Sequence, residues 1–267
     1  LADQNQLPSI APAATSDSVE TGGYLFRTCF KDSYQGEIAA KFAAEDLKVK
    51  KVAVLYGTGD PYSSGVGKAF VNAAKKAGLD VVAEENSSSA DDTEYSSQLQ
   101  KVQAAGAEFL YAPYYYSAAG PYIIPQARSI GYEGDIMGPD GYDGLQITGN
   151  KSRYDKVLYT THYSPDDTSN KKVQRFIKSY RKANNGASPN TFAALGYDSV
   201  YMFRQAIEKA GPSASRADIR KAIYGMSFSG VTGKFTLDSH GSPKKSVIVL
   251  EMKNGKPTYR STIEPAK

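Results

Sequence analysis

The chain has 267 residues, of which 40% are hydrophobic and 22% charged, and its formal net charge is +4. This length suits two globular domains, and lysine and arginine are scattered apart from a short cluster at Lys48–Lys51, so no nucleic-acid partner is expected. One cysteine, two histidines and no long apolar run exclude an intrachain disulfide, a credible zinc site and a membrane span, and no metal or cofactor is expected.

Hydrophobic periodicity predicts alternating strands and helices over the first 160 residues or so. The chain begins with the end of a helix, Ala2–Gln6, followed by strands at Leu7–Ala11 and Leu25–Phe30. Further strands are predicted at Lys51–Tyr56, Leu79–Ala83, Glu108–Ala112, Asp135–Gly138 and Lys156–His162, and helices at Tyr34–Leu47, Ser63–Ala77, Asp92–Ala105 and Ala118–Ile130. Strands that alternate with helices of about ten to fifteen residues indicate βαβ units and a parallel sheet.

The pattern changes to helices after Pro165-Asp166-Asp167. Helices are predicted at Ser169–Asn184, Asn190–Ala210 and Arg216–Tyr224, and strands at Gly230–Asp238, Ser246–Lys253 and Pro257–Ile263. The dipeptide Asn254-Gly255 between the last two strands is a strong hairpin signal. We therefore expect two α/β lobes, with the chain crossing between them more than once.

The stretch 131–145 contains the most informative polar residue. The apolar pair Ile136–Met137 leads into Gly138-Pro139-Asp140-Gly141, which places the Asp140 carboxylate at the carboxyl end of a strand. In open α/β sheets ligands bind outside these strand ends, so Asp140 could hold a cation such as an ammonium group. The alternative is that Asp140 only caps the following turn or helix, as Asp commonly does.

Other polar and aromatic residues also follow predicted strands, namely Thr15, Tyr62 and Tyr114–Tyr116. Because the carboxyl ends of parallel strands meet at one edge, Tyr62, Tyr115 and Asp140 are expected to converge, with Thr15 facing them from the other lobe. Hydroxyls for a carboxylate, an acid for an ammonium group and aromatic rings for a side chain describe an amino-acid pocket. Binding fits better than reaction, since no residue here is an obvious nucleophile or general base.

The sequence does not match the known nucleotide-binding and catalytic motifs that it most resembles. Gly57-Thr58-Gly59 follows a strand, but Tyr62 occupies the position of the third glycine of a dinucleotide fingerprint. Cys29 lies inside an apolar strand and is read as an inert core residue. His162 follows a strand without a partner nucleophile or metal set, which favours a structural role over a catalytic one.

Several segments, spread in order along the whole chain, resemble one family. They are Pro12-Ala13-Ala14-Thr15, the stretch 26–36, the stretch 126–131, Gly138-Pro139-Asp140-Gly141, the stretch 162–167, Ala194-Leu195-Gly196-Tyr197-Asp198 and the stretch 228–233. The chain resembles the branched-chain (Leu/Ile/Val) amino-acid-binding proteins of ABC importers, which have the type I periplasmic-binding-protein fold.

The resemblance implies an α/β fold of two hinged lobes, each a parallel sheet flanked by helices, that close on a ligand. Lobe 1 would comprise residues 1–32 and 163–245, and lobe 2 residues 33–162 and 246–267. It also implies a non-enzymatic extracellular or periplasmic receptor that delivers an amino acid, aliphatic or branched-chain, to the permease of an ABC transporter.

The resemblance extends to individual residues of the site. The loop Ala13-Ala14-Thr15 would supply the lobe-1 contacts, with the Ala13 carbonyl and Thr15 binding the ammonium and carboxylate of the ligand. Asp140 matches the acid that pairs with the ammonium group, where the best-known members carry the longer Glu. Tyr62 and Tyr115 match the lobe-2 aromatic residues that cover the ligand.

One departure is that the first part of lobe 1, with its serine-bearing loop and membrane-anchored N-terminus, has no counterpart in this sequence. We therefore expect an incomplete lobe 1, with the rest missing or supplied by a separate chain, and poor solubility or weak binding from these 267 residues alone. Two alternatives stay open: a ligand-sensing regulatory domain of the same fold, and an open α/β enzyme that uses Asp140 and a Tyr as an acid/base pair.

Overall fold

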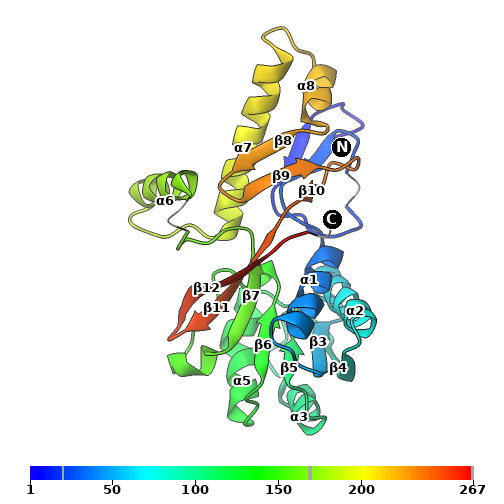
Figure 1. The fold of residues 1–267 in the computed structure, drawn as a ribbon, viewed down its shortest axis with the longest axis vertical. Coiled ribbons are helices and arrows are strands. Elements are labelled where there is room, and N and C mark those ends of the chain that lie inside the picture. Colours follow the sequence, from blue (N-terminus) through cyan, green and yellow to red (C-terminus); the bar gives the residue numbers. More distant parts are fainter. Residues whose placement is uncertain (20, 168–169, 266–267) are drawn as a thin grey trace. The chain divides into compact units, whose positions relative to one another are not determined.

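The computed structural model describes residues 1–267 except residues 20, 168–169 and 266–267. The chain folds into two compact units. Unit 1 comprises Leu1–Lys31, His162–Val247 and Glu264–Lys267, and unit 2 comprises Asp32–Thr161 and Ile248–Ile263. The colours of Figure 1 follow the chain as it passes from one unit to the other after each of these segments.

Unit 2 is built on a seven-stranded sheet with the strand order β12-β11-β7-β6-β5-β3-β4. The strands are β3 (Lys51–Gly57), β4 (Asp80–Ser87), β5 (Phe109–Tyr111), β6 (Asp135–Gly138), β7 (Val157–Thr161), β11 (Val247–Lys253) and β12 (Lys256–Ile263). Strands β4, β3, β5, β6 and β7 pair in parallel, whereas β11 pairs antiparallel with β7. The predicted parallel sheet is confirmed. Its antiparallel neighbour is β11, which lies near the carboxyl end of the chain.

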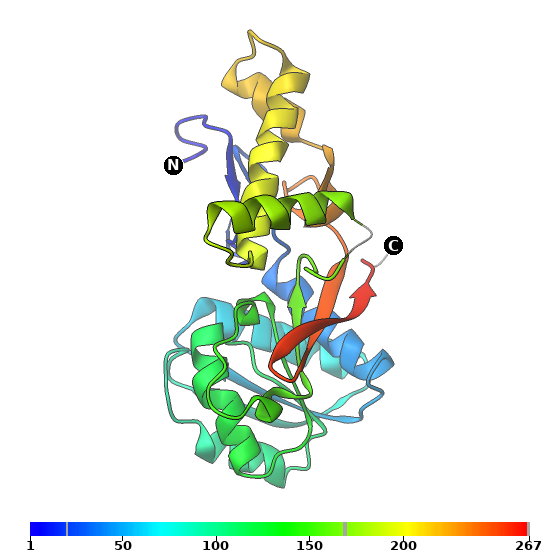
Figure 2. The same cartoon turned by 90° about the vertical axis from the view of Figure 1, so that its left-hand side faces the viewer.

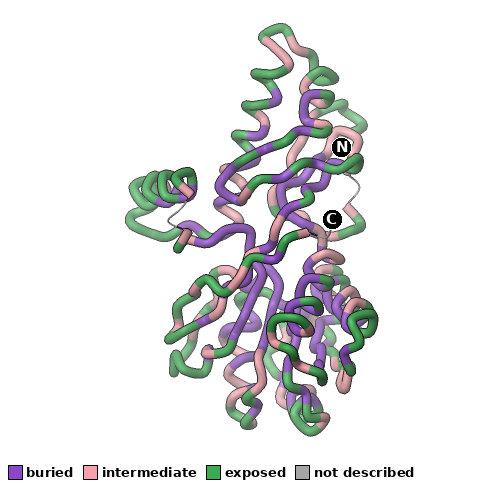
Figure 3. Tube along the Cα trace, viewed as in Figure 1, coloured by how far each residue is buried: buried purple, intermediate pink, exposed green. Residues whose placement is uncertain are grey.

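Helices cover both faces of this sheet, and its central strands β3, β5, β6 and β7 are accordingly apolar on both sides. The helices are α1 (Asp32–Glu45), α2 (Pro61–Lys76), α3 (Ser96–Ala104), α4 (Tyr116–Ala118), the π-helical turn η1 (Ala119–Ile123) and α5 (Ile124–Ser129), with short 3-10 turns at Asp140–Tyr142 and Lys151–Tyr154. On β5, Phe109 and Tyr111 stack against Phe70 of α2, while Leu110 between them joins the core formed with α3 and α5. This alternation leaves the carboxyl ends of the parallel strands open to carry loops. The central strands β3, β5, β6 and β7 are almost wholly buried, and Figure 3 shows this buried middle of the unit.

The described residues of unit 1 form two small sheets and three helices. Strands β1 (Ser9–Ala11) and β2 (Leu25–Arg27) pair in parallel, and β8 (Ser227–Gly230), β9 (Gly233–Leu237) and β10 (Pro243–Lys244) form an antiparallel sheet. The helices are α6 (Lys171–Ala183), α7 (Thr191–Ala210) and α8 (Arg216–Ile223). Figure 2 shows α6 lying across the first half of α7, where Phe176 and Ile177 of α6 share a core cluster with Ala194. Phe26 of β2 packs in a second cluster with α7 and α8.

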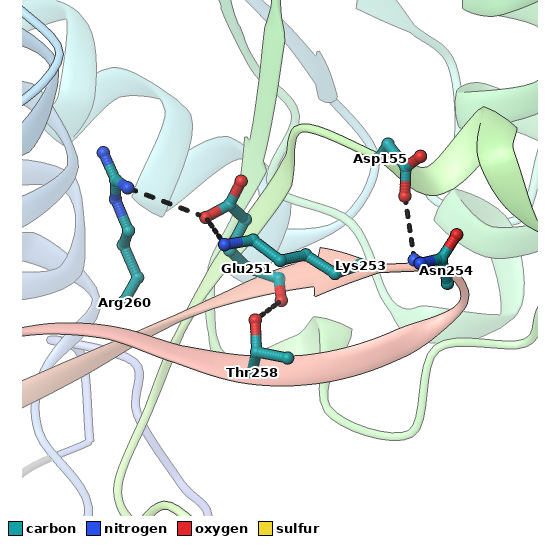
Figure 4. A network of polar contacts seen from close by, with 6 residues as sticks. All are labelled: Asp155, Glu251, Lys253, Asn254, Thr258 and Arg260. Atoms are coloured by element: carbon teal, nitrogen blue, oxygen red, sulfur yellow. Dashed lines mark hydrogen bonds and ion pairs between the residues drawn. The ribbon is translucent and has the colours of Figure 1, made fainter.

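The hairpin of β11 and β12 turns at Asn254-Gly255, as predicted. Both residues have positive φ, 52° and 72°, which is the backbone of a tight hairpin turn. The Asn254 N–H donates to Asp155 Oδ1 at 2.9 Å, and Glu251 Oε2 lies 3.4 Å from Lys253 Nζ and 3.8 Å from Arg260 Nη1 (Figure 4). The bond to Asp155 ties the hairpin to the rest of unit 2, while the ion pair of Glu251 with Arg260 links its two strands.

Two predicted elements at the start and middle of the chain are wrong. Residues 2–6 form turns rather than a helix end. The helix predicted at Ala118–Ile130 is broken into α4, η1 and α5, since Pro121 and Pro125 remove two backbone donors and Gly120 lies against the backbone at Gln146.

The strand predicted at Gly230–Asp238 is confirmed at Gly233–Leu237, which is β9, but its start is wrong, because the chain turns at Val231-Thr232 after β8. The start of the helix predicted at Ser169 lies outside the described residues, and the described helix begins at Lys171. Within the part of the chain that the structure describes, no helix has both the length and the apolar character that a membrane crossing requires.

Candidate functional site

Three strand ends of unit 2 bring Tyr62, Tyr115 and Asp140 together. Tyr62 stands in the first turn of α2 after β3, Tyr115 follows β5, and Asp140 follows β6. The Tyr62 hydroxyl donates to Asp140 Oδ1 at 2.7 Å, and the rings of Tyr62 and Tyr115 stack with centroids 5.0 Å apart. The predicted convergence of these three residues is confirmed.

Asp140 is a buried carboxylate, only 1% exposed, held from two sides. Its backbone N–H donates to Gln35 Oε1 at 2.9 Å, and the Gly141 N–H donates to the Tyr62 hydroxyl at 2.9 Å. Thr160 of β7 also donates to Gln35 Oε1, at 3.1 Å. The turn that carries the acid is therefore fixed by α1, α2 and β7 together.

The phenols beside Asp140 are kept protonated. Burial, and next the charge of Asp140, raise the pKa of Tyr62 well above its usual value, so Tyr62 acts as a hydrogen-bond donor. Burial, and then nearby carboxylates led by Asp60, raise the pKa of Tyr115 to about 12. Tyr115 is 37% exposed, so one ring of the stacked pair is accessible to a ligand.

A second buried carboxylate, Asp32, also raises the pKa values of tyrosines near Asp140. It is the first residue of α1 and 2% exposed, and its charge contributes, after burial and the charge of Asp140, to the raised pKa values of Tyr62 and Tyr111. Two acids beside neutral phenols make this end of unit 2 electronegative, which suits a cation such as an ammonium group. Asp32 was not predicted as a site residue from the sequence.

Gln35 and Tyr111 were missed by the sequence analysis. Both are fully buried, and among the described residues Gln35 Nε2 and the Tyr111 hydroxyl have no hydrogen-bond partner. Tyr111 was read as a core strand residue and Gln35 as part of a helix. The sequence indicated a role for these two residues only through their positions. Gln35 lies in a segment that resembles the family, and Tyr111 ends the strand that precedes Tyr115.

In unit 1, the loop that contains Ala13, Ala14 and Thr15 follows β1 and is held by Arg27. The Arg27 guanidinium is fully buried, and its Nη1 donates to the carbonyls of Ala14, Thr15 and Ser16 at 3.0, 3.1 and 3.1 Å. Its Nη2 donates to the Val19 carbonyl at 2.7 Å. Thr15 is buried and Ala13 exposed. The sequence analysis missed this role of Arg27, and the orientation of Thr15 toward Asp140 stays a prediction.

His162 and Cys29 have the surroundings of core residues. The His162 ring is 2% exposed and stacks on Phe30 with centroids 3.7 Å apart, and its backbone N–H donates to the Thr191 hydroxyl at 3.2 Å. Cys29 is buried in the same unit. Both settings agree with the structural roles expected from the sequence.

The sequence profile of the periplasmic binding protein family matches residues 1–257. This chain belongs to the periplasmic binding protein family. The family resemblance and the α/β fold predicted from the sequence are therefore confirmed.

Relatives of this periplasmic binding protein include several named for the amino acids they bind. A leucine-, isoleucine-, valine-, threonine- and alanine-binding protein of Pseudomonas aeruginosa is 29% identical over 240 residues, which are 88% of this chain and 62% of that protein. The chain thus spans about three fifths of the length of the curated relatives it matches.

Solved structures of binding proteins have the same fold as this chain. A leucine-binding protein, LivK, of Thermotoga maritima superposes with a TM-score of 0.88 at 33% identity, covering 99% of this chain and 75% of that one. A branched-chain amino-acid transporter substrate-binding protein, LivJ, of Streptococcus pneumoniae in complex with isoleucine gives 0.87 at 31% identity, covering 99% and 74%.

Proposed function

We propose that this periplasmic binding protein is an extracellular or periplasmic receptor that captures an aliphatic or branched-chain amino acid for an ABC transporter. The observation that carries the proposal is the buried Asp140 bonded to Tyr62 at the carboxyl ends of parallel strands. Relatives and structural neighbours named for binding leucine, isoleucine and valine support it. Units 1 and 2 then correspond to the two lobes of the family.

In this proposal each residue has a chemical role. Asp140 pairs with the ligand ammonium group, which replaces some of the solvation that a buried carboxylate lacks. The stacked rings of Tyr62 and Tyr115 offer an apolar face to the ligand side chain. The loop Ala13-Ala14-Thr15, kept in shape by Arg27, supplies carbonyl and hydroxyl groups to the other end of the amino acid.

Binding would act by population shift, because a ligand that contacts both units favours the arrangement in which both sets of groups reach it. The membrane anchor and the separate chain expected from the sequence stay predictions.

Calorimetric titration of leucine, isoleucine and valine into the protein tests the proposal. We expect Asp140→Asn to weaken binding by about two to three orders of magnitude, because a buried ammonium group loses its charged partner. The matched control is Asp80→Asn, which removes an exposed carboxylate at the opposite, amino-terminal end of β4. Equal affinity in Asp140→Asn and the parent, or no heat with any of the three ligands, would refute the proposal.

A further inference from the structure

Helix α6 carries the excess positive charge of the whole protein. Its basic side chains are Lys171, Lys172, Arg175, Lys178, Arg181 and Lys182, and it has no acidic residue. The full chain has a net charge of +4, so removal of these six charges leaves −2 for all the rest. Lysine and arginine were expected to be scattered apart from Lys48–Lys51, and α6 shows that this expectation was wrong.

The stability of α6 explains only Arg181 and Lys182, which stand in its last turn, where the helix dipole favours cations. Lys171 and Lys172 stand in the first turn, where the helix dipole disfavours cations. Lys171 and Arg175, and likewise Lys178 and Lys182, are like charges four residues apart, a spacing that destabilises a helix. The apolar face of α6 is already buried in the core of unit 1, and all six cations are on the exposed side.

These cations have no acidic partner among the described residues. Their hydrogen bonds go to neutral oxygens: Arg175 Nε donates to the Lys171 carbonyl at 3.3 Å, Arg181 Nη2 to Ser188 Oγ at 2.9 Å, and Lys172 Nζ to the Ser229 carbonyl. Their charge is therefore available to a partner.

A groove lies directly beside this charge. A cavity of about 540 Å³ is lined by Lys172 and Arg175 of α6, by Tyr197 and Tyr201 of α7, and by the segment 228–231. The two phenol rings lie 4.7 Å apart, and Tyr201 is 42% exposed. The cavity also contains two acids whose charge is already engaged, the first being Asp198, which accepts hydrogen bonds from the turn of β8 and β9.

The second acid is Glu208, which pairs with Arg204 at 2.7 Å, and both side chains also line the groove. On the same helix, Val200 and Ile207 are 67% and 48% exposed. A partner therefore meets cations along α6, phenol rings in the groove, and exposed apolar side chains followed by an acid along α7.

We propose that the surface formed by α6 and α7 docks an acidic segment of a protein partner that inserts one apolar side chain between α6 and the Tyr197–Tyr201 pair. Carboxylates of the segment bind Arg175, Lys178 and their basic neighbours, which is the complementarity that selects partners and speeds encounter. A flat anionic membrane fits less well, because it would contact the cations of α6 but leave the groove beside them unfilled. A peptide can place its acids along α6 and its apolar residues along α7.

The test uses a short, fluorescently labelled peptide rich in Asp and Glu with one central Phe, and a matched peptide with Asn and Gln in place of the acids. Anisotropy is measured with the parent protein and with Arg175→Glu/Lys178→Glu. The control is Lys75→Glu/Lys76→Glu, which reverses two exposed cations in the last turn of α2. Vesicles of phosphatidylglycerol and phosphatidylcholine form a separate arm.

We expect the acidic peptide to bind and the amide peptide not to bind. The α6 reversal should weaken binding about tenfold or more, since two attractive charges become repulsive, while the α2 control stays near the parent. Tyr201→Ser should weaken binding several-fold with an unchanged circular dichroism spectrum. The proposal is overturned if both reversals cause equal losses, if the two peptides bind alike, if no peptide binds, or if only the vesicles bind.

Discussion

Helices α1 and α2 of unit 2 approach each other so closely at Gly36 that an added methyl group has no room. A Cβ on Gly36 would lie 2.5 Å from the backbone nitrogen of Phe70 and 2.7 Å from the Cβ of Ala69. Both atoms belong to the rigid part of α2, so neither can turn aside as a long side chain could. Gly36→Ala therefore requires the two helices to separate.

Helix propensity and packing make opposite predictions for this substitution. Alanine inside a helix is favoured over glycine by about 1 kcal/mol. Overpacking of a well-filled core costs about 1–3 kcal/mol, and the contact with backbone places Gly36 at the upper end. We expect Gly36→Ala to lower the free energy of unfolding by about 1–2 kcal/mol in net terms.

The effect should also reach the candidate site, because the neighbouring Gln35 holds the backbone of Asp140. A shift of α1 moves Gln35 Oε1 away from the Asp140 N–H, so affinity for a branched-chain amino acid should fall together with stability. Urea unfolding followed by circular dichroism measures the first effect and calorimetry the second.

The control is Gly65→Ala in α2, which changes the same residue type in a neighbouring helix. Gly65 is exposed, and its added Cβ would meet only Asp32 Oδ2, at an ordinary 3.9 Å. This variant should be more stable than the parent by about 0.5–1 kcal/mol. If Gly36→Ala is stabilised to the same extent as Gly65→Ala, the packing argument is wrong.

Three further predictions concern other parts of the chain. Arg27→Met removes the donors that hold the loop around Thr15, and we expect a loss of about 2–4 kcal/mol in urea unfolding together with faster proteolysis of that loop. Equal proteolysis of variant and parent would contradict this role. Asp198→Asn replaces an acceptor of three hydrogen bonds by one oxygen and a donor, so unfolding should require about 2–4 kcal/mol less. An unchanged urea midpoint would exclude Asp198 as the anchor of its turn. The pKa of the Tyr115 phenol is raised from 10.0 to about 12 in the folded protein. The neutral phenol therefore stabilises the fold fully below pH 10, and this contribution to the free energy of unfolding is lost as the pH rises through about 12. Ultraviolet titration of phenolate should show fewer ionised tyrosines in the native protein than in urea over that interval, and coincident curves would count against the buried phenols.

The strand-end part of the candidate site could be predicted because it follows from local patterns and one topological rule. The strands before Tyr62, Tyr115 and Asp140 are short apolar segments, and all three are parallel. Parallel strands present their carboxyl ends at one edge, so the residues that follow them must lie near one another. The hairpin at Asn254-Gly255 was equally local, since those two residue types favour the positive φ that the turn requires.

The residues that hold this site in place could not be predicted in the same way. Gln35 binds the backbone of Asp140 across 105 positions of sequence, and neither residue differs in pattern from an ordinary helix or turn residue. Arg27 sits in a strand-like run that gives no sign of where its guanidinium points. The turn at Val231-Thr232 was predicted as part of a strand. The carboxylate that binds this turn, Asp198, lies on α7, so the sequence next to the turn carries no signal of it.

The sequence by itself determined the order of strands and helices, the parallel sheet of unit 2 and the family of the protein, because these depend on periodicity and on residues close together in the chain. Only the tertiary structure decided which buried polar groups pair, where Gly36 lets two helices touch, and that the cations of α6 gather beside a groove. Those features arise from contacts between segments far apart in sequence, where hydrogen-bond satisfaction and close packing select the partners.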